Sequence, residues 1–201
     1  MDKQIKNIEI EIKVEIDNLE NFISKLLKTN AKFLGRDFQR TVRMETPNMD
    51  LEKKKLFLRV RSGFGNIVTL KVKNKDNKNF MQRDEYETEV KDIDTLSEIF
   101  SILGFSKRLI LEKYRVNFLF KEVKISIDEL PFGIYVELEG DENYINEVAE
   151  ELGLDTTKGI TVTYWDLFED YKKQKNILNE ESIIFPKNYN SQIMKLDFPQ
   201  K

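Results

Sequence analysis

The residues of this chain that could do chemistry are carboxylates and cations placed at alternate positions. In the stretch IEIEIKVEI, residues 8–16, Glu9, Glu11 and Lys13 alternate with isoleucine and valine. If this stretch is a β-strand, its charged side chains share one face and its apolar side chains the other. Carboxylates bind hard divalent cations, and ammonium or guanidinium groups bind phosphate oxygens. The stretch could hold a metal–phosphate ligand if its charged face is enclosed.

The same alternation recurs along the chain and predicts further strands. The stretches cover residues 56–62, 67–73, 83–90, 109–118, 121–130 and 133–140. Their charged positions add arginines and lysines as well as acids, while the opposite positions are rich in Leu, Ile and Val. This is typical of antiparallel strands that are apolar on one face.

Apolar residues at helical spacing predict four helices. These cover residues 17–30, 92–104, 141–153 and 163–175. A short internal echo links two of the strand–helix pairs, because EIEIKV and DNLENFISKLL resemble EYETEV and DIDTLSEIF. The echo favours two related halves in one closed sheet.

The charged faces of these strands have two interpretations. In an open sheet they point to water, where exposed ion pairs contribute about 0–1 kcal/mol. In a closed barrel they line a tunnel, where unpaired charges are costly and require ligands of opposite charge. A polyphosphate carrying Mg²⁺ or Mn²⁺ would satisfy both the acids and the bases. The alternation by itself leaves both interpretations open.

The composition narrows the class of protein. Neither Cys nor His occurs among the 201 residues, which excludes thiolate nucleophiles and histidine bases. The net charge of -3 argues against broad nucleic-acid binding. No apolar run is long enough for a membrane span, and the first residues lack the apolar core of a signal peptide. We therefore expect a cytoplasmic protein that binds neither nucleic acid nor membrane.

A series of short motifs follows in a fixed order along the chain. They are EIEIK (9–13), LRVR (58–61), TLK (69–71), RDEYE (83–87), EKYR (112–115), SIDELPFGIYVELEG (126–140) and VTYWDLF (162–168). Together they resemble the CYTH superfamily, the triphosphate tunnel metalloenzymes, which includes class IV adenylate cyclases and thiamine triphosphatases. The resemblance covers residues 8 to about 170.

The resemblance implies an α+β fold, a closed eight-stranded antiparallel β-barrel with flanking helices. Residues 1–175 would form this tunnel domain, and residues 176–201 a C-terminal extension that packs on the barrel. The tunnel would bind a triphosphate group together with Mg²⁺ or Mn²⁺.

The resemblance also implies roles for individual residues. The triphosphate-binding set would be Lys13, Arg59, Arg61, Lys71, Arg83, Lys113 and Arg115. The metal-binding set would be Glu9, Glu11, Glu85, Glu87, Glu137 and Glu139, with Glu89 continuing that row. Asp128 would lie near the metal or orient a base. The catalytic set would be Glu9, Glu11, Lys13, Asp128 and Glu137.

The chain departs from the family pattern at a few positions. Thr41 and Arg43 follow Gln39 where many cyclase-like members have an acidic residue and a tyrosine. Arg43 could be an extra phosphate ligand or an outward surface charge, and of the two we expect the surface charge. Lys73 is a further candidate cation. Some members use a lysine near the C-terminus, for which the candidates are Lys158, Lys172, Lys173 and Lys175.

The expected function is metal-dependent hydrolysis of a triphosphate such as tripolyphosphate, ATP or thiamine triphosphate. An alternative is the class IV adenylate cyclase reaction, which converts ATP into cyclic AMP and pyrophosphate in the same kind of tunnel. A further alternative is a sensor that binds a polyphosphate or nucleotide without turnover. The sequence leaves a homodimer open.

Overall fold

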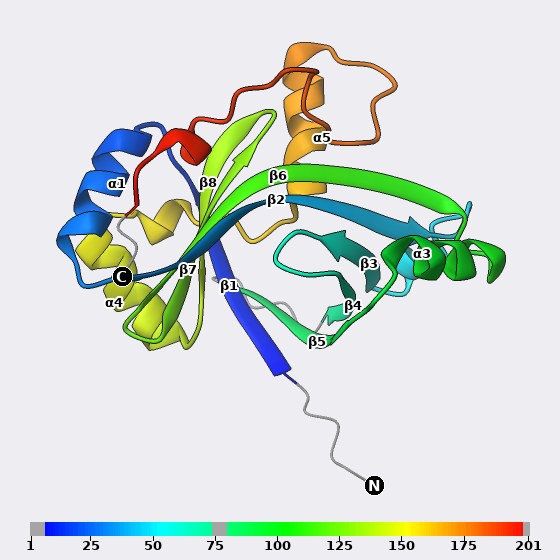
Figure 1. Ribbon diagram of the computed structural model, residues 1–201, viewed down its shortest axis with the longest axis horizontal. Helices are drawn as coiled ribbons and strands as arrows, with labels where there is room; N and C mark the ends of the chain where they lie inside the picture. The colour runs from blue at the N-terminus through cyan, green and yellow to red at the C-terminus, as the bar shows by residue number, and fades with distance from the viewer. Residues whose placement is uncertain (1–6, 74–79, 199–201) are drawn as a thin grey trace, which may run out of the picture.

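Eight antiparallel strands close into a barrel in the computed structural model, which describes residues 7–73 and 80–198 (Figure 1). The strands lie in the order β1-β5-β4-β3-β2-β6-β7-β8 around the barrel. Their bounds are β1 Asn7–Glu15, β2 Lys32–Glu45, β3 Leu56–Ser62, β4 Ile67–Lys73, β5 Met81–Glu89, β6 Lys107–Phe120, β7 Val123–Leu130 and β8 Gly133–Glu139. The closed-barrel interpretation is therefore confirmed.

The four predicted helices are present, with small differences at their ends. They are α1 (Leu19–Lys28), α3 (Ile93–Ile102), α4 (Glu142–Leu152) and α5 (Tyr164–Lys175). A short α2 (Asp50–Lys53) and two 3₁₀ turns, Thr156–Lys158 and Ile193–Lys195, complete the described elements. Helices α1 and α4 lie at one end of the molecule, α3 lies at the other, and α5 stands on one side (Figure 1). No described helix is long and apolar enough to cross a membrane.

The alternation did not predict β2, although the resemblance required an eighth strand. Its inward side chains Gln39 and Thr41 are polar but uncharged, and several of its outward side chains, such as Arg40, are exposed. A register shift between Phe33 and Gly35 also interrupts its pairing with β6. Since neither face is consistently charged or apolar, β2 has no clear period of two.

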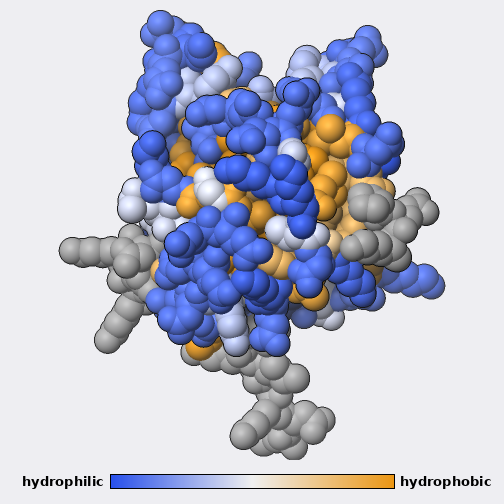
Figure 2. Space-filling model, turned by 90° about the vertical axis from the view of Figure 1, so that its left-hand side faces the viewer, coloured by the Kyte–Doolittle hydropathy of each residue, from blue (hydrophilic) through white to orange (hydrophobic). Residues whose placement is uncertain are grey.

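The apolar face of the barrel points outward against the helices. Ile12, Val136 and Leu138 are no more than 2 % exposed, and they pack with the apolar side chains of α1 and α4, including Leu26 and Val148. The opposite faces of the same strands carry the charged rows. Burying the apolar face under helices therefore turns the charged face into the barrel. The molecular face that carries α1 and α4 is mostly hydrophilic on its outside (Figure 2).

The two halves of the chain follow the same path. If each strand from β1 to β4 trades places with its counterpart from β5 to β8, every strand of the barrel keeps the same kind of neighbours. For example, the pair β1–β8 becomes β5–β4, which is also a neighbouring pair. Strands β1 and β5, which carry the repeated motif, are direct neighbours, with Ile8 opposite Asp84. This arrangement is the one that the internal echo predicts.

The C-terminal extension packs along the outside of the barrel. Ile183 forms a parallel bridge with Leu111 of β6, and the ring of Phe198 stacks on Phe33 of β2 at 5.5 Å. The main anchor is Glu129 of β7, which is 0% exposed. It accepts hydrogen bonds from the Tyr189 hydroxyl (2.7 Å), the Ser191 hydroxyl (2.5 Å) and the backbone N–H groups of Gln192 (2.9 Å) and Ile193 (3.1 Å).

Replacing the Glu129 anchor should loosen the extension. In Glu129→Ala, the donors of the extension lose a buried acceptor, so we expect the free energy of unfolding to fall by about 2 kcal/mol or more in urea. Limited proteolysis should then cut the extension faster. Glu150→Ala on the exposed side of α4 should change stability by less than about 0.5 kcal/mol. Equal stability of the two variants would contradict the anchoring role.

Candidate active site

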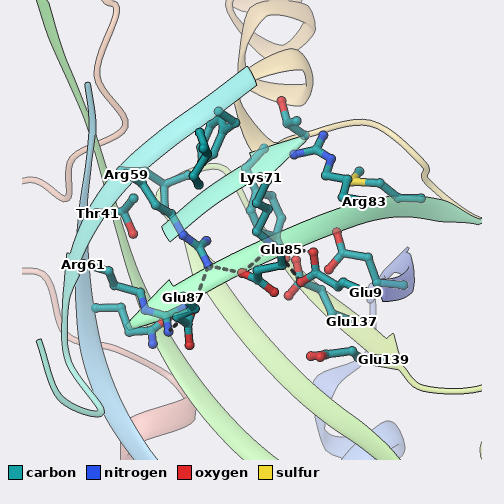
Figure 3. A pocket seen from close by; sticks show the side chains of 18 of the residues that line it. Glu9, Thr41, Arg59, Arg61, Lys71, Arg83, Glu85, Glu87, Glu137 and Glu139 are labelled. Atoms are coloured by element: carbon teal, nitrogen blue, oxygen red, sulfur yellow. Dashed lines mark hydrogen bonds and ion pairs between the residues drawn. The ribbon is translucent and has the colours of Figure 1, made fainter. Parts of the chain in front are cut away.

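The barrel interior contains a cavity of about 1300 Å³ lined by the inward charged rows. Every residue of the expected triphosphate-binding set lines it: Lys13, Arg59, Arg61, Lys71, Arg83, Lys113 and Arg115. Every residue of the expected metal-binding set lines it as well: Glu9, Glu11, Glu85, Glu87, Glu137 and Glu139. The fold thus brings these residues into one cavity, as Figure 3 shows for many of them.

Strand register sets acids beside bases within the cavity. Glu9 of β1 is paired with Arg83 of β5, and Lys71 of β4 is paired with Glu85 of β5. Lys13 of β1 is paired with Glu137 of β8. Opposite charges at facing positions of an antiparallel pair attract each other, so the register that buries the outer apolar face also neutralises much of the inner face.

The first group of charges, which we call the Lys71 cluster, consists of Glu9, Arg59, Lys71 and Glu85. The Lys71 ammonium lies 2.7 Å from a carboxylate oxygen of Glu9 and 3.4 Å from one of Glu85. The Arg59 guanidinium lies 3.5 Å from Glu85. Carboxylates from β1 and β5 therefore converge on a single cation (Figure 3).

Arg61 and Glu87 extend this arrangement along the tunnel. The guanidinium of Arg61 is 3.8 Å from a carboxylate oxygen of Glu87, which also accepts a hydrogen bond of 3.0 Å from the Thr69 hydroxyl. Burial, together with the charges of Arg59 and Arg115, lowers the pKa of Arg61 to about 10. Burial is the larger cause of this shift, and the neighbouring arginines add to it, so an anionic ligand would stabilise the charged guanidinium.

The second group, the Asp128 cluster, lies on β6, β7, β8 and α5. Asp128 is 0% exposed and accepts hydrogen bonds from Lys113 (2.8 Å), Arg115 Nε (2.6 Å) and the Tyr164 hydroxyl (2.8 Å). Arg115 also forms a short ion pair with Glu137. Asp128 does not line the cavity itself. Asp128 was expected either to lie near the metal or to orient a base. Its contacts with Lys113 and Arg115 favour the second role, the orientation of basic side chains.

Lys13 connects β1 to the Asp128 cluster. Its ammonium lies 2.6 Å from Glu11 and 3.5 Å from Glu137, and 5.5 Å from the centre of the Tyr164 ring. The Lys113 ammonium lies 5.2 Å from the same ring. Two lysines thus lie close to the Tyr164 ring, where cation–π attraction adds to their ion pairs.

Mutual pairing keeps most of the Asp128 cluster ionised despite burial. Burial opposes the charge of Asp128 and Glu137, but Arg115 and Lys113 outweigh it and hold the pKa of both carboxyls below their usual range. Burial likewise opposes the charge of Lys13, but Glu11 and Glu137 raise its pKa. These groups are charged at neutral pH.

Lys113 is the exception within this cluster. Burial and the nearby charge of Arg115 lower its pKa to about 8, although Asp128 and Glu137 act in the opposite direction. Its ammonium is therefore the tunnel cation whose charge is most easily changed near neutral pH.

The acids could hold a metal ion only with help from a ligand. Among the residues that the structure describes, no three acidic side chains converge closely enough to hold a metal by themselves. Glu9 and Glu85 nevertheless meet at the Lys71 ammonium, and all donors of the expected set are carboxylate oxygens, which suit Mg²⁺ and Mn²⁺. The residues fit a hard cation that takes its remaining ligands from phosphate and water.

The expectation that Arg43 is a surface charge was wrong. Arg43 is 8% exposed and lies beyond the cavity lining, where it binds Glu52 (2.8 Å) and the fully buried Glu45 (3.3 Å). Its guanidinium also faces the rings of Phe57 and Trp165. The inward direction of odd-numbered positions on β2 explains its burial.

The remaining lysine candidates lie outside the cavity lining. Lys172 contacts Glu169 and the Glu180 carbonyl, Lys173 contacts Asp170, and Lys158 lies near Asp155. Lys175 at the end of α5 and Lys73 at the end of β4 are exposed. Glu89, at the end of β5, is exposed as well. None of these described side chains lines the cavity.

Sequence reasoning did not assign site roles to the residues that α5 contributes. Thr163, Tyr164 and Trp165 all line the cavity, and Thr163 caps α5 in a reciprocal capping box with Asp166. The motif VTYWDLF held the signal, but alternation along strands cannot show that a helix start projects into a barrel.

The family model of the CYTH domain matches residues 7–164 of the chain. The chain belongs to the CYTH family. A relative from Methanocaldococcus jannaschii, whose name describes a candidate adenylate cyclase, is 31% identical over 149 residues, which are 72% of this chain and 85% of the relative.

Solved structures share this CYTH fold. A conserved hypothetical protein from Pyrococcus furiosus has a TM-score of 0.68 at 27% identity, covering 79% of this chain and 99% of that protein. A Hippeastrum protein, described as a candidate adenylyl cyclase with a dominant triphosphatase activity, has a TM-score of 0.59 at 16% identity, covering 81% and 96%. At that identity the second likeness shows the fold alone.

The titration of Lys113 can be measured directly. In NMR spectra of protein labelled at lysine, the Lys113 signal should titrate at about pH 8, well below the ordinary value of about 10.4. Lys113→Arg should remove this signal. Since the unfolded chain keeps the proton to higher pH, this group makes the free energy of unfolding rise with pH between these two values. Titration of Lys113 at or above pH 10 would contradict the buried cationic environment.

The Tyr164 hydroxyl should contribute to the stability of the Asp128 cluster. Tyr164→Phe keeps the ring but removes one donor to a buried carboxylate, so we expect the free energy of unfolding to fall by about 1–2 kcal/mol. Tyr144→Phe on the exposed part of α4 is the matched control and should show almost no change. Denaturation in urea measures both, and equal effects would argue against a specific role for the Tyr164 hydroxyl.

Proposed function

We propose that this protein is a divalent-metal-dependent triphosphatase that binds a triphosphate group inside the barrel and hydrolyses its terminal phosphoanhydride bond. The observation that carries the proposal is the cavity itself, which is lined by every residue of the expected triphosphate-binding and metal-binding sets. An anion binder alone would not need this many carboxylates.

The tunnel cations suit a triphosphate in number and kind. Arg59, Arg61 and Arg115 offer planar forks for pairs of phosphate oxygens, and Lys13, Lys71 and Lys113 offer compact charges. Each of these groups has an acidic partner no more than 3.8 Å away. The oxygens of a bound triphosphate would replace those carboxylates as the partners of the arginines and lysines.

The acids released from the bases would be the metal ligands. Glu9 and Glu85 already converge on one cationic group, and Glu11, Glu137 and Glu139 line the cavity near β1 and β8. A bound Mg²⁺ or Mn²⁺ would neutralise charge on the phosphate oxygens and lower the pKa of a coordinated water.

The chain's own residues then position the reaction. The arginines and lysines hold the triphosphate extended along the tunnel and stabilise the charge that develops on the transferred phosphoryl group. Asp128 and Tyr164 keep Lys113 and Arg115 oriented toward the ligand. An inward carboxylate accepts the proton of the attacking water, and orthophosphate leaves with a diphosphate product.

The adenylate cyclase reaction is the second candidate. The relative from Methanocaldococcus jannaschii is named as a candidate cyclase, and the same tunnel could hold ATP with its ribose 3′-hydroxyl near the α-phosphorus. The Hippeastrum protein, which shares the fold, is described with a triphosphatase activity, so the fold is compatible with hydrolysis. Hydrolysis also needs fewer specific contacts, since water replaces a positioned hydroxyl. A sensor that binds without turnover is the third candidate.

The products distinguish these functions. We expect purified protein with Mg²⁺ or Mn²⁺ to release orthophosphate from tripolyphosphate, ATP or thiamine triphosphate. ³¹P NMR of the reaction mixture identifies the phosphate products. Glu9→Gln should reduce the rate by at least about 10²-fold, because it removes a ligand that converges on the cation site. Glu150→Gln, on the exposed side of α4, is the matched control. Pyrophosphate with cyclic AMP would establish the cyclase instead, and binding without turnover would establish the sensor.

A further inference from the structure

The cavity is larger than a bare triphosphate requires. Its volume of about 1300 Å³ exceeds the range of about 300–1,000 Å³ that is usual for small-molecule sites. The cations lie along the strands, whereas the start of α5 adds an aromatic surface. This surface is formed by Trp165 of α5 and Phe57 of β3, both of which line the cavity.

The two rings lie directly beside the phosphate-binding cations. Phe57 is paired in register with Lys71 and precedes Arg59 by two positions on the same inward face. The Trp165 ring contacts the Phe57 ring at 5.5 Å between centroids, with the planes tilted by 58°. A group attached to one end of a triphosphate held by Lys71 and Arg59 would therefore meet these rings.

Arg43 packs against both rings. Its guanidinium lies 5.3 Å from the Phe57 ring centre and 5.9 Å from the Trp165 ring centre, and Arg43 itself does not line the cavity. Glu45 and Glu52 fix Arg43 in turn. The aromatic surface is thus preformed, so a ligand would lose little free energy in ordering it.

The Trp165 ring also has one polar atom without a partner. Its Nε1–H group is buried and makes no hydrogen bond within the described part of the chain. The ring itself, rather than this buried atom, is what a ligand in the cavity would contact, and a planar heteroaromatic group offers a face for stacking on it.

We propose that Trp165 and Phe57 form an aromatic subsite that takes the planar organic group of an organic triphosphate, and that Trp165 sets the preference for such a substrate over tripolyphosphate. The proposal rests on the triphosphatase function proposed above. It adds a specificity-determining residue from α5 to a tunnel whose other ligands come from strands.

Because Trp165 is the only tryptophan of the chain, binding at this subsite has its own signal. With MgCl₂ present, adenosine 5′-(β,γ-imido)triphosphate should quench the tryptophan fluorescence in a saturable manner. Tripolyphosphate, read immediately after mixing, should quench it much less. Equal quenching by both, or no quenching by the nucleotide, would overturn the subsite.

Kinetics test the preference. In Trp165→Leu, the ratio of kcat/KM for ATP to that for tripolyphosphate should fall about tenfold or more, since stacking of a base on an aromatic ring is lost. Phe57→Leu should lower the same ratio. This variant tests the subsite if Trp165→Leu does not fold. Tyr171→Leu is the matched control, because Tyr171 packs on Phe132 within α5's apolar cluster and does not line the cavity.

The outcomes separate the two proposals. A ratio that stays within twofold in Trp165→Leu would overturn the subsite while leaving the triphosphatase intact. If neither substrate is hydrolysed, the triphosphatase proposal fails, and the fluorescence titration still decides the subsite by whether the nucleotide analogue quenches Trp165.

Discussion

Closure of the sheet around an inward row of charges is the constraint on which the rest of this molecule depends. Once the apolar faces of the strands are buried under α1 and α4, the charged faces have no open solvent to face. Buried charges are tolerated only when they are paired, so each strand must present acids where its neighbour presents bases. The pairing of Glu9 with Lys71 and of Asp128 with Arg115 meets this demand. The ion pairs that stabilise the charges inside the barrel therefore involve the same groups that a ligand would contact.

The two charged clusters of the tunnel meet this constraint in different ways. The Asp128 cluster is tight and fully buried at its centre, with hydrogen bonds of 2.6–2.8 Å from three side chains. The Lys71 cluster combines a contact of 2.7 Å between Lys71 and Glu9 with contacts of 3.4–3.5 Å to Glu85, and its carboxylates lie at the cavity surface. The two clusters thus differ in burial: Asp128 lies behind the cavity lining and Glu9 and Glu85 lie in it.

The sequence predicted the strands with strong alternation, because parity alone determines which side chains share a face. The alternation alone could not predict the direction of that face, which depends on closure between β1 and β8 and on helices that come from distant parts of the chain. The resemblance to the CYTH superfamily did predict that it points inward. The alternation also missed β2, whose inward Gln39 and Thr41 are uncharged. The expectation of a surface position for Arg43 was wrong, because a lone arginine beside polar residues is typical of an exposed strand position. Its contacts with the rings of Phe57 and Trp165 come from other parts of the chain. The roles of Tyr164 and Trp165 were out of reach for a similar reason, since their position depends on where α5 begins relative to the barrel.

The repeated path of the two halves has a consequence for the orientation of a ligand in the cavity. The strand order is the same when β1–β4 and β5–β8 are exchanged, yet the two halves carry unequal charges: Lys71 of β4 has its counterpart strand in β8, which carries Glu137 and Glu139. A linear triphosphate without substituents has identical ends. In a frame with equal halves those ends would be interchangeable, whereas two halves of unequal charge would distinguish them. Such a barrel would give a direction to a ligand that is itself symmetric.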